Sequence, residues 1–192
     1  MSYRDLKSYQ QATIIYDFTV EFCDRYIDKK SRTTDQMVQA ARSGKQNIVE
    51  GSTERTSKKS ELYLLGVARA SFQELLEDFE DFLRQRSLTQ WGKNDLRALE
   101  VRNLYKSNQS YQSNQTDRSD WTNRSYLTYK SYLTNSEIAA NVAICLINQA
   151  NFLLDRQIKA LESQFIEKGG WSENLRHQRE EEKKRKLKKF LL

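Results

Sequence analysis

Proline is absent from this chain of 192 residues, and glycine occurs only six times. Turn-rich β sandwiches and barrels normally need more of both residues, because glycine and proline set the backbone of tight turns. Apolar residues make up 38% of the chain, which is enough for a slender helical bundle with a charged exterior. The composition therefore predicts an all-α protein.

Histidine and cysteine, which build most catalytic and metal sites, are scarce. The single histidine, His177, stands in a charged C-terminal segment, where it is a poor member of any nucleophile–histidine–acid arrangement. Cys23 and Cys145 are far apart in the sequence, and we expect buried thiols, not a disulfide or a metal site. The glycines are isolated and form no phosphate loop. No catalytic residue, cofactor or metal is predicted, and we expect no enzymatic activity.

Long hydrophobic runs are also missing. The mean hydropathy is −0.85, and no run approaches the roughly 18 to 20 apolar residues of a membrane span. Residues 1–7 are polar and lead into no signal-peptide core. We therefore expect a cytoplasmic protein without a membrane partner.

Apolar residues at helical spacing predict three helices in the first half of the chain. The first spans about residues 8–29, where Ser8 and Gln11 read as a capping box. The second begins near residue 33 and ends at Gly51, as at a glycine stop. The third, about residues 57–86, has an apolar seam that only Arg69 interrupts. The seam consists of Leu62, Leu65, Phe72, Leu76, Phe79 and Leu83.

Small residues cluster on the second helix, at Ala40, Ala41, Ser43 and Gly44. Without bulky side chains, the backbone of one helix can come close to the next. We therefore expect a neighbouring helix to pack closely at this point.

Composition changes over residues 105–134, which are rich in Ser, Asn, Gln, Thr and Tyr and nearly free of aliphatic residues. Such a stretch buries too little apolar area to offset the entropy lost on ordering it. We interpret it as a polar insertion, whose tyrosines could order in part on a neighbouring surface.

A fourth helix is predicted from Thr134, with Glu137 completing a capping box, to about Lys168. It has two apolar faces, of which a four-helix bundle needs only one. The second face could be covered by the insertion or tail of the same chain, or by another subunit, which we favour. The residues predicted to form this oligomer interface are Ile144, Ile147, Leu154 and Ile158.

Together, these patterns predict an antiparallel up-down four-helix bundle over residues 1–168. The polar insertion at about residues 105–134 precedes the fourth helix. After Gly169-Gly170, residues 169–192 are predicted to form a basic C-terminal helical tail.

The formal net charge is +6 and the pI is about 9.2, which favours nucleic acid or an acidic protein as the partner. The basic residues predicted to bind nucleic acid are Arg42, Lys45, Arg55, Lys58 and Lys59 around the second turn, and Lys183, Lys184, Arg185 and Lys186 in the tail. Neither group is interleaved with aromatic residues, so binding would be directed at phosphates and sensitive to salt. An ordinary solvated surface is the alternative at both places.

The third helix also carries a row of carboxylates, Glu74, Glu77, Asp78, Glu80 and Asp81. The Glu-x-x-His pairs of a ferritin-like metal site are absent. We interpret the row as a solvated acidic face or as an interface to basic neighbours.

The stretch Ala40-Ala41-Arg42-Ser43-Gly44-Lys45-Gln46-Asn47-Ile48-Val49-Glu50-Gly51 resembles the second-helix signature of four-helix bundle proteins related to the 23S rRNA intervening-sequence (S23) protein. The third-helix pattern of that family is matched at Lys58, Leu65, Ala68, Ser71 and Glu74-Leu75. This resemblance covers about residues 6–88. Residues 140–151, Leu161-Glu162 and Gly169-Gly170 resemble the longer subfamily with a four helix bundle suffix domain.

The resemblance implies an antiparallel bundle that assembles as a homopentamer. It also implies relatives that serve as accessory proteins to reverse transcriptases in diversity-generating retroelements, where they bind RNA and the polymerase through a basic surface. By position, only the basic character at Arg42, Lys45, Arg55 and Lys58 carries over.

The leading hypothesis is a non-enzymatic, homo-oligomeric adaptor that binds structured RNA, or an RNA–reverse transcriptase complex, through phosphate contacts. The alternative is a protein–protein interaction scaffold that binds no nucleic acid and uses its charge for solubility and partner steering. Binding assays at two salt concentrations distinguish the two hypotheses.

Overall fold

The computed structural model describes residues 2–53, 57–112, 126–169 and 171–190, and these residues contain helices and no β-strand. A short 3-10 helix, η1 (Tyr3–Asp5), is followed by α1 (Lys7–Tyr26), α2 (Arg32–Thr53) and α3 (Lys58–Gln85). The second half contains α4 (Leu96–Gln112), α6 (Ser136–Lys168) and α7 (Trp171–Phe190). The prediction of an all-α protein is confirmed.

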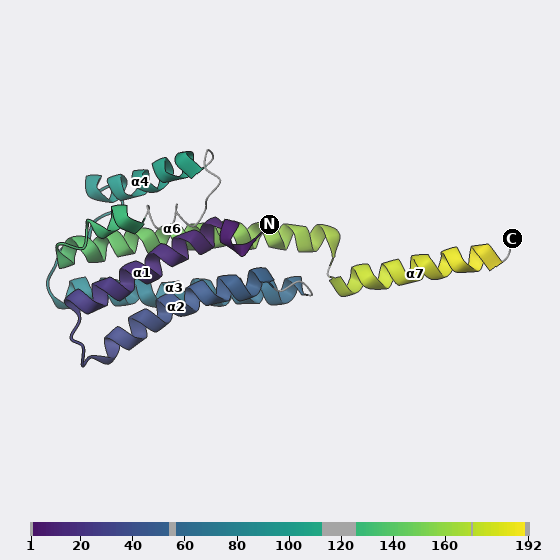
Figure 1. Ribbon diagram of the computed structural model, residues 1–192, viewed down its shortest axis with the longest axis horizontal. Helices are drawn as coiled ribbons and strands as arrows, with labels where there is room; N and C mark the ends of the chain where they lie inside the picture. The colour runs from purple at the N-terminus through teal and green to yellow at the C-terminus, as the bar shows by residue number, and fades with distance from the viewer. Residues whose placement is uncertain (1, 54–56, 113–125, 170, 191–192) are drawn as a thin grey trace.

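Four long helices, α1, α2, α3 and α6, form the packed body (Figure 1). Helix α2 packs against α1 and α3, and α6 packs against α3 and α1. Phenylalanines fill the centre: the ring of Phe22 lies 4.9 Å, centroid to centroid, from those of both Phe79 and Phe82. Most of the apolar seam predicted on the third helix is buried here, with Leu62 only partly buried.

The small residues of α2 allow the close approach predicted for them. A Cβ atom at Gly44 would lie 2.6 Å from Cζ of Phe72, so the phenylalanine ring occupies the space that any side chain would need. At the preceding position of each helix, the hydroxyl oxygens of Ser43 and Ser71 are 2.9 Å apart. Helices α2 and α3 are therefore joined by an interlocking ring and a hydrogen bond.

Gly51 does not end its helix as predicted. Helix α2 continues to Thr53, and Gly51 is buried within it. A Cβ atom at this position would lie 3.4 Å from the backbone oxygen of Glu61 and from Cβ of Leu64. The glycine is needed for close packing between α2 and α3, and this packing was not visible from the local sequence.

Two helix N-termini also differ from their predictions. Leu6 is the N-cap of α1, and Ser8 lies inside the helix, where its hydroxyl donates to Oε1 of Gln157 at 2.6 Å. Helix α6 is capped by Asn135, whose side chain accepts from the backbone N–H groups of Glu137 and Ile138. Ser8 has a long-range partner on α6, and asparagine is a stronger cap than threonine, which explains both differences.

Where the structure describes it, the predicted polar insertion is largely helical. Its first residues belong to α4, an unexpected helix that packs on the outside of α6 (Figure 1). Residues 126–130 are helical as well; Tyr129 is buried there, and the Tyr126 hydroxyl donates to Glu21 of α1. Residues 113–125 lie outside the described residues. The described parts cover sides of α6 and α1 that the four-helix core leaves open.

This cover changes the interpretation of the second apolar face of α6. Ile144, Ile147 and Leu154 are buried within one chain, and Ile158 is partly buried. A subunit interface requires side chains that are exposed in the free subunit, so these four residues do not support one. Helix α4 of the same chain packs on α6, and homo-oligomerisation stays a prediction.

Helix α6 is also the one described helix that is long and apolar enough to cross a membrane, by length and composition. The most apolar 18-residue window within Ser136–Glu167 has a mean hydropathy of 1.3, but 61% of this window is buried inside the protein. A core helix with neighbours on several sides has these properties, and α6 contacts α1, α3 and α4. The absence of a membrane partner stays a prediction.

Helix α7 continues beyond the C-terminal end of α6 and leads away from the packed body (Figure 1). Gly169 ends α6 with a φ of 68°, in the left-handed region that glycine adopts without strain. The described side chains at positions 176–186 are all exposed. The charged residues at positions 176–186 are therefore exposed to solvent on all sides of α7.

Candidate nucleic-acid interface

Helix α7 presents a row of basic side chains along one face. Arg176, Arg179, Lys183 and Lys186 follow one another at steps of three, four and three residues, so they lie one above another on the helix. These four residues form the α7 basic stripe. Arg176 makes an exposed ion pair, 3.4 Å from its Nε to Oε1 of Glu180. Among the described side chains, the other three make no ion pair.

Sequence reasoning identified the charge of the tail but only part of this face. Lys183 and Lys186 belong to the stripe, whereas Lys184 and Arg185 lie roughly 100° and 200° further around the helix from Lys183. Arg185 is 3.8 Å from Glu182. The spacing of Arg176 and Arg179 from Lys183 is the signal that would have shown the stripe.

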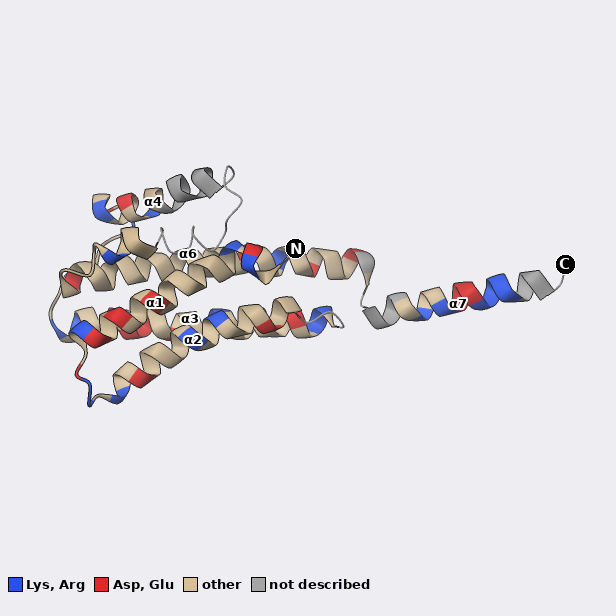
Figure 2. Ribbon diagram, in the orientation of Figure 1, with Lys and Arg blue, Asp and Glu red and all other residues tan. Residues whose placement is uncertain are grey.

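Three consecutive glutamates, Glu180 to Glu182, lie in the middle of α7, with basic residues on both sides (Figure 2). The ion pairs they make are exposed, and pairs of this kind contribute little to stability. A helix that is polar all round gains nothing from packing on the core. The charges of α7 are therefore available for a partner.

The basic residues around the second turn are less available. Lys58, in the first turn of α3, donates to Oε2 of Glu61 at 2.9 Å, and Glu61 is buried. Lys59 is exposed. Arg55 lies outside the described residues. The charge of Lys58 is thus partly neutralised by its own helix, which also relieves its unfavourable position at a helix N-terminus.

Arg42 and Lys45 stand apart from that turn. Nζ of Lys45 lies 4.0 Å from the centre of the Tyr16 ring, a cation–π contact that holds the lysine against α1. Eight residues of helix, roughly 12 Å, separate Lys45 from the last residue of α2. Arg42 is exposed. The structure does not gather the four described residues, Arg42, Lys45, Lys58 and Lys59, into one patch, and Lys and Arg are spread widely over the packed body (Figure 2).

A groove between α2 and α3 was not predicted. The α2–α3 groove has a volume of about 890 Å³ and is lined by Arg32, Asp35, Gln36, Val38, Gln39, Ala40, Ser43, Ser71, Glu74 and Asp78. Burial raises the pKa of the Asp78 carboxyl, and the nearby carboxylates of Asp81 and Glu74 raise it further. The groove is therefore a polar depression with an excess of negative charge, at the place where the sequence shows a row of carboxylates.

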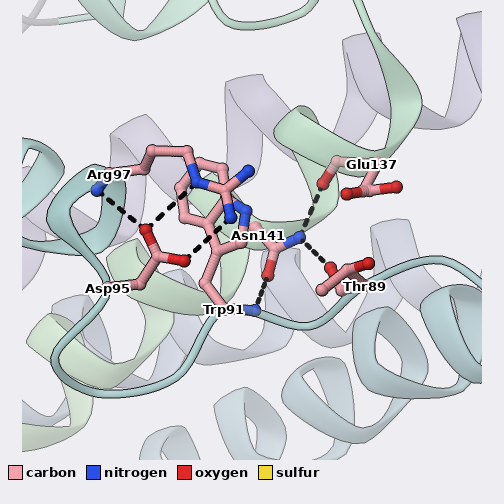
Figure 3. Close-up of polar contacts among 6 residues, drawn as sticks. All are labelled: Thr89, Trp91, Asp95, Arg97, Glu137 and Asn141. Carbon is pink, nitrogen blue, oxygen red and sulfur yellow. Dashed lines mark hydrogen bonds and ion pairs between the residues drawn. The ribbon is translucent and has the colours of Figure 1, made fainter.

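A buried amide fixes the connection between α3 and α4 (Figure 3). The side-chain oxygen of Asn141, on α6, accepts from the Trp91 backbone N–H at 2.7 Å. Its amide nitrogen donates to the backbone oxygens of Thr89 and Glu137 at 2.8 and 2.9 Å. Arg97, paired with Asp95, covers the Trp91 ring at 4.7 Å. This arrangement satisfies every polar atom of the Asn141 side chain, so its role is to position the connection.

A second polar cluster holds residues 126–133 on α1. Glu21 receives hydrogen bonds from Tyr126 and Arg25, and Nζ of Lys130 lies 3.1 Å from its Oε2. Burial alone would raise the pKa of Glu21, but these three partners lower it below its usual value. Arg25 also donates to the Leu133 backbone oxygen at 2.9 Å. The cluster is therefore structural, with its charges satisfied internally.

Neither thiol is placed for chemistry. Burial raises the pKa of Cys23 to about 12 and that of Cys145 to about 11. Sγ of Cys23 lies 3.9 Å from Sδ of Met37, a contact between two soft, apolar groups. Within the described part of the chain, no three His, Cys, Asp or Glu side chains are grouped so that they could hold a metal ion.

Comparison of the chain with known protein families, with curated proteins and with solved structures finds no match. Function therefore has to be inferred from the residues and their geometry.

Proposed function

We propose that this protein is a non-enzymatic adaptor that binds nucleic acid, in the first place structured RNA, through the α7 basic stripe. The observation that carries the proposal is the exposure of Arg179, Lys183 and Lys186 on a helix that leads away from the packed body. Unpaired cations on such a helix can approach phosphates without first breaking a contact within the protein. Because no aromatic residue lies among them, binding would depend on phosphates and on salt, not on base sequence.

The packed body is the scaffold in this proposal, and we place it in the antiparallel up-down four-helix bundle class. The packing of α1 with α2, α2 with α3, α3 with α6 and α6 with α1 supports that class. Membership of the S23 family, a homopentameric assembly and a role beside a retroelement reverse transcriptase belong to the same proposal. They are supported by the residues of α2 and α3 that resemble the family's signature.

The test is binding of a structured RNA to the full chain over a range of salt concentrations. Changing Lys183 and Lys186 to Gln should weaken binding and lower the slope of log affinity against log salt by roughly 0.7 to 0.9 for each lost phosphate contact. Lys59→Gln with Lys159→Gln removes two charges from exposed residues of the packed body and is the matched control, for which we expect a smaller effect. Equal affinity of the wild type and the double variant at low salt would reject the stripe as the site.

A protein–protein interaction scaffold is the second candidate, and the α2–α3 groove favours it. A groove with excess negative charge repels nucleic acid and would accept a basic protein segment. If the wild type does not bind RNA at low salt, the scaffold becomes the preferred function.

A further inference from the structure

We propose that the α2–α3 groove binds the α7 basic stripe of a second copy of this chain. The inference extends the homo-oligomeric part of the proposed function and does not depend on RNA binding. It assigns a surface to the assembly in place of the apolar residues of α6, which the chain itself covers.

Within the described residues, the negative charge of the groove has no basic partner. Asp35, on α2, and Glu74, on α3, are exposed and face the groove together with the half-buried Asp78. Among the described residues, no lysine or arginine makes an ion pair with any of these three carboxylates. Arg32 is the single basic residue in the lining, so the lining residues carry an excess of negative charge.

The spacing of charge on the two surfaces matches. Glu74 and Asp78 are four residues apart on α3, so they lie one above the other, separated by one helical turn. Arg179 and Lys183 have the same separation on α7. A helix lying along the groove can therefore set one cation opposite each carboxylate. The stripe, from residue 176 to 186, is roughly 15 Å long, enough for such a contact.

The groove lining suits a polar helix. Gln36, Gln39, Ser43 and Ser71 contribute amides and hydroxyls, and apolar contact is limited to Val38 and Ala40. An amphipathic helix would leave its apolar face poorly covered here. A lysine- and arginine-rich helix can use the lining amides and hydroxyls and extend its aliphatic stems over Val38.

A second copy is the natural source of this helix. Helix α7 leads away from its own packed body, so its stripe is presented to other molecules (Figure 1). A contact between α7 of one copy and the groove of the next joins two different surfaces. Repetition of such a heterologous contact closes into a ring when the rotation allows it, which agrees with the proposed homopentamer.

The test measures the mass of the full chain by light scattering and sedimentation, without nucleic acid, at low and high salt. We expect oligomers at low salt that dissociate as salt rises. Reversing the charge of the groove with Asp35→Lys and Glu74→Lys should weaken association at least about tenfold. Reversing the charge of the stripe with Arg179→Glu and Lys183→Glu should weaken it to a similar extent. Joining all four substitutions in one chain should restore association, because both surfaces are then inverted.

A control variant distinguishes loss of the contact between groove and stripe from a general effect of net charge on association. Glu50→Lys with Glu77→Lys changes the charge equally on exposed residues of α2 and α3 outside the groove lining, and should leave association within about twofold. Circular dichroism verifies that each variant is folded. If the lysine variant of the groove does not fold, Asp35→Asn with Glu74→Gln removes the same charges with less change of shape.

Four results would overturn the proposal. They are a monomeric wild type at low salt, association that charge reversal in the groove leaves unchanged, an equal loss of association in the Glu50→Lys, Glu77→Lys control, and a variant with all four substitutions that does not associate. A monomer in which α7 docks on its own groove is covered by the first result. Failure of RNA binding does not affect the association measurements, which contain no nucleic acid. The Asn and Gln groove variant should bind RNA at least as well as the wild type, because its α7 basic stripe is no longer held in a groove. The two proposals can therefore fail separately.

Discussion

The packed body and α7 are both helical, but their helices have different sources of stability. In the packed body, side chains such as Phe18 and Phe72 are completely buried, and tertiary packing holds the helices in place. The described side chains of α7 at positions 176–186 are exposed, and ion pairs such as Arg176 with Glu180 are its visible support. Substitutions in the first region should change stability, and substitutions in the second should change binding.

The largest effect is expected at Gly44, where the ring of Phe72 lies 2.6 Å from the position of a Cβ atom. Gly44→Ala forces the ring or the helix to move and should cost about 1 to 3 kcal/mol of unfolding free energy, measured by urea titration. Gly66→Ala is the matched control, because apart from its chain neighbours and the backbone of its own helix, nothing lies within 4 Å of its Cβ position. There, removing a helical glycine should stabilise the protein by up to about 1 kcal/mol. Equal effects at the two glycines would contradict the packing described for α2 and α3.

Asn141 comes next. Asn141→Leu keeps the approximate size of the side chain but leaves the Trp91 N–H and the Thr89 carbonyl without their partner. We expect a loss of about 1 to 2 kcal/mol, together with faster hydrogen exchange at the Trp91 amide. Asn148→Leu is the control, because the amide of this exposed residue donates only within its own helix, to Ile144. An unchanged exchange rate at Trp91 would show that Asn141 does not hold this connection.

Glu21 should give a smaller effect that depends on pH. Its pKa in the folded protein is below the ordinary value of 4.5, so its ionised form stabilises the fold above that pH. Glu21→Gln should therefore cost up to about 1 kcal/mol near neutral pH. The difference from wild type should disappear as the pH falls through the lowered pKa. Urea titrations between about pH 3 and 7 measure this difference in unfolding free energy, and Glu162→Gln, at an exposed position, is the control. A difference that grows as the pH falls would contradict the lowered pKa of Glu21.

The smallest effect on stability is expected from removing α7. Deletion of residues 171–192 should change the unfolding free energy of the packed body by less than about 0.5 kcal/mol, the range of ordinary surface changes. The same deletion should abolish RNA binding and self-association. A loss of more than about 1 kcal/mol in urea titration would mean that α7 supports the fold, and the distinction between the two regions would fail.

The sequence predicted what depends on local pattern. The seam from Leu65 to Leu83 and the small residues beside Gly44 were sufficient to place α3 in the core and α2 against it. Contacts between distant residues could not be predicted in the same way. Ser8 was interpreted as a cap because its partner Gln157 is remote in sequence, and Gly51 as a stop because Glu61 lies on the next helix.

The candidate binding surfaces were also predicted only as far as local sequence pattern allows. Charge in the tail was evident from composition, and the stripe could have been read from the spacing of Arg176, Arg179 and Lys183. The α2–α3 groove depends on the relative position of Asp35 and Glu74 on two helices, which no linear pattern contains. Helix α4 was missed because its apolar residues, such as Ala98 and Val101, are few and give no strong period.

The two cysteines make the protein convenient for spectroscopy. Cys23 is buried and Cys145 is partly buried, and because their pKa values lie near 12 and 11, neither thiol ionises at neutral pH. A cysteine introduced by Lys184→Cys, on the exposed side of α7 away from the basic stripe, would be the preferred target of a maleimide dye or a nitroxide. Distances from α7 to a neighbouring molecule could then be measured without replacing Cys23 or Cys145.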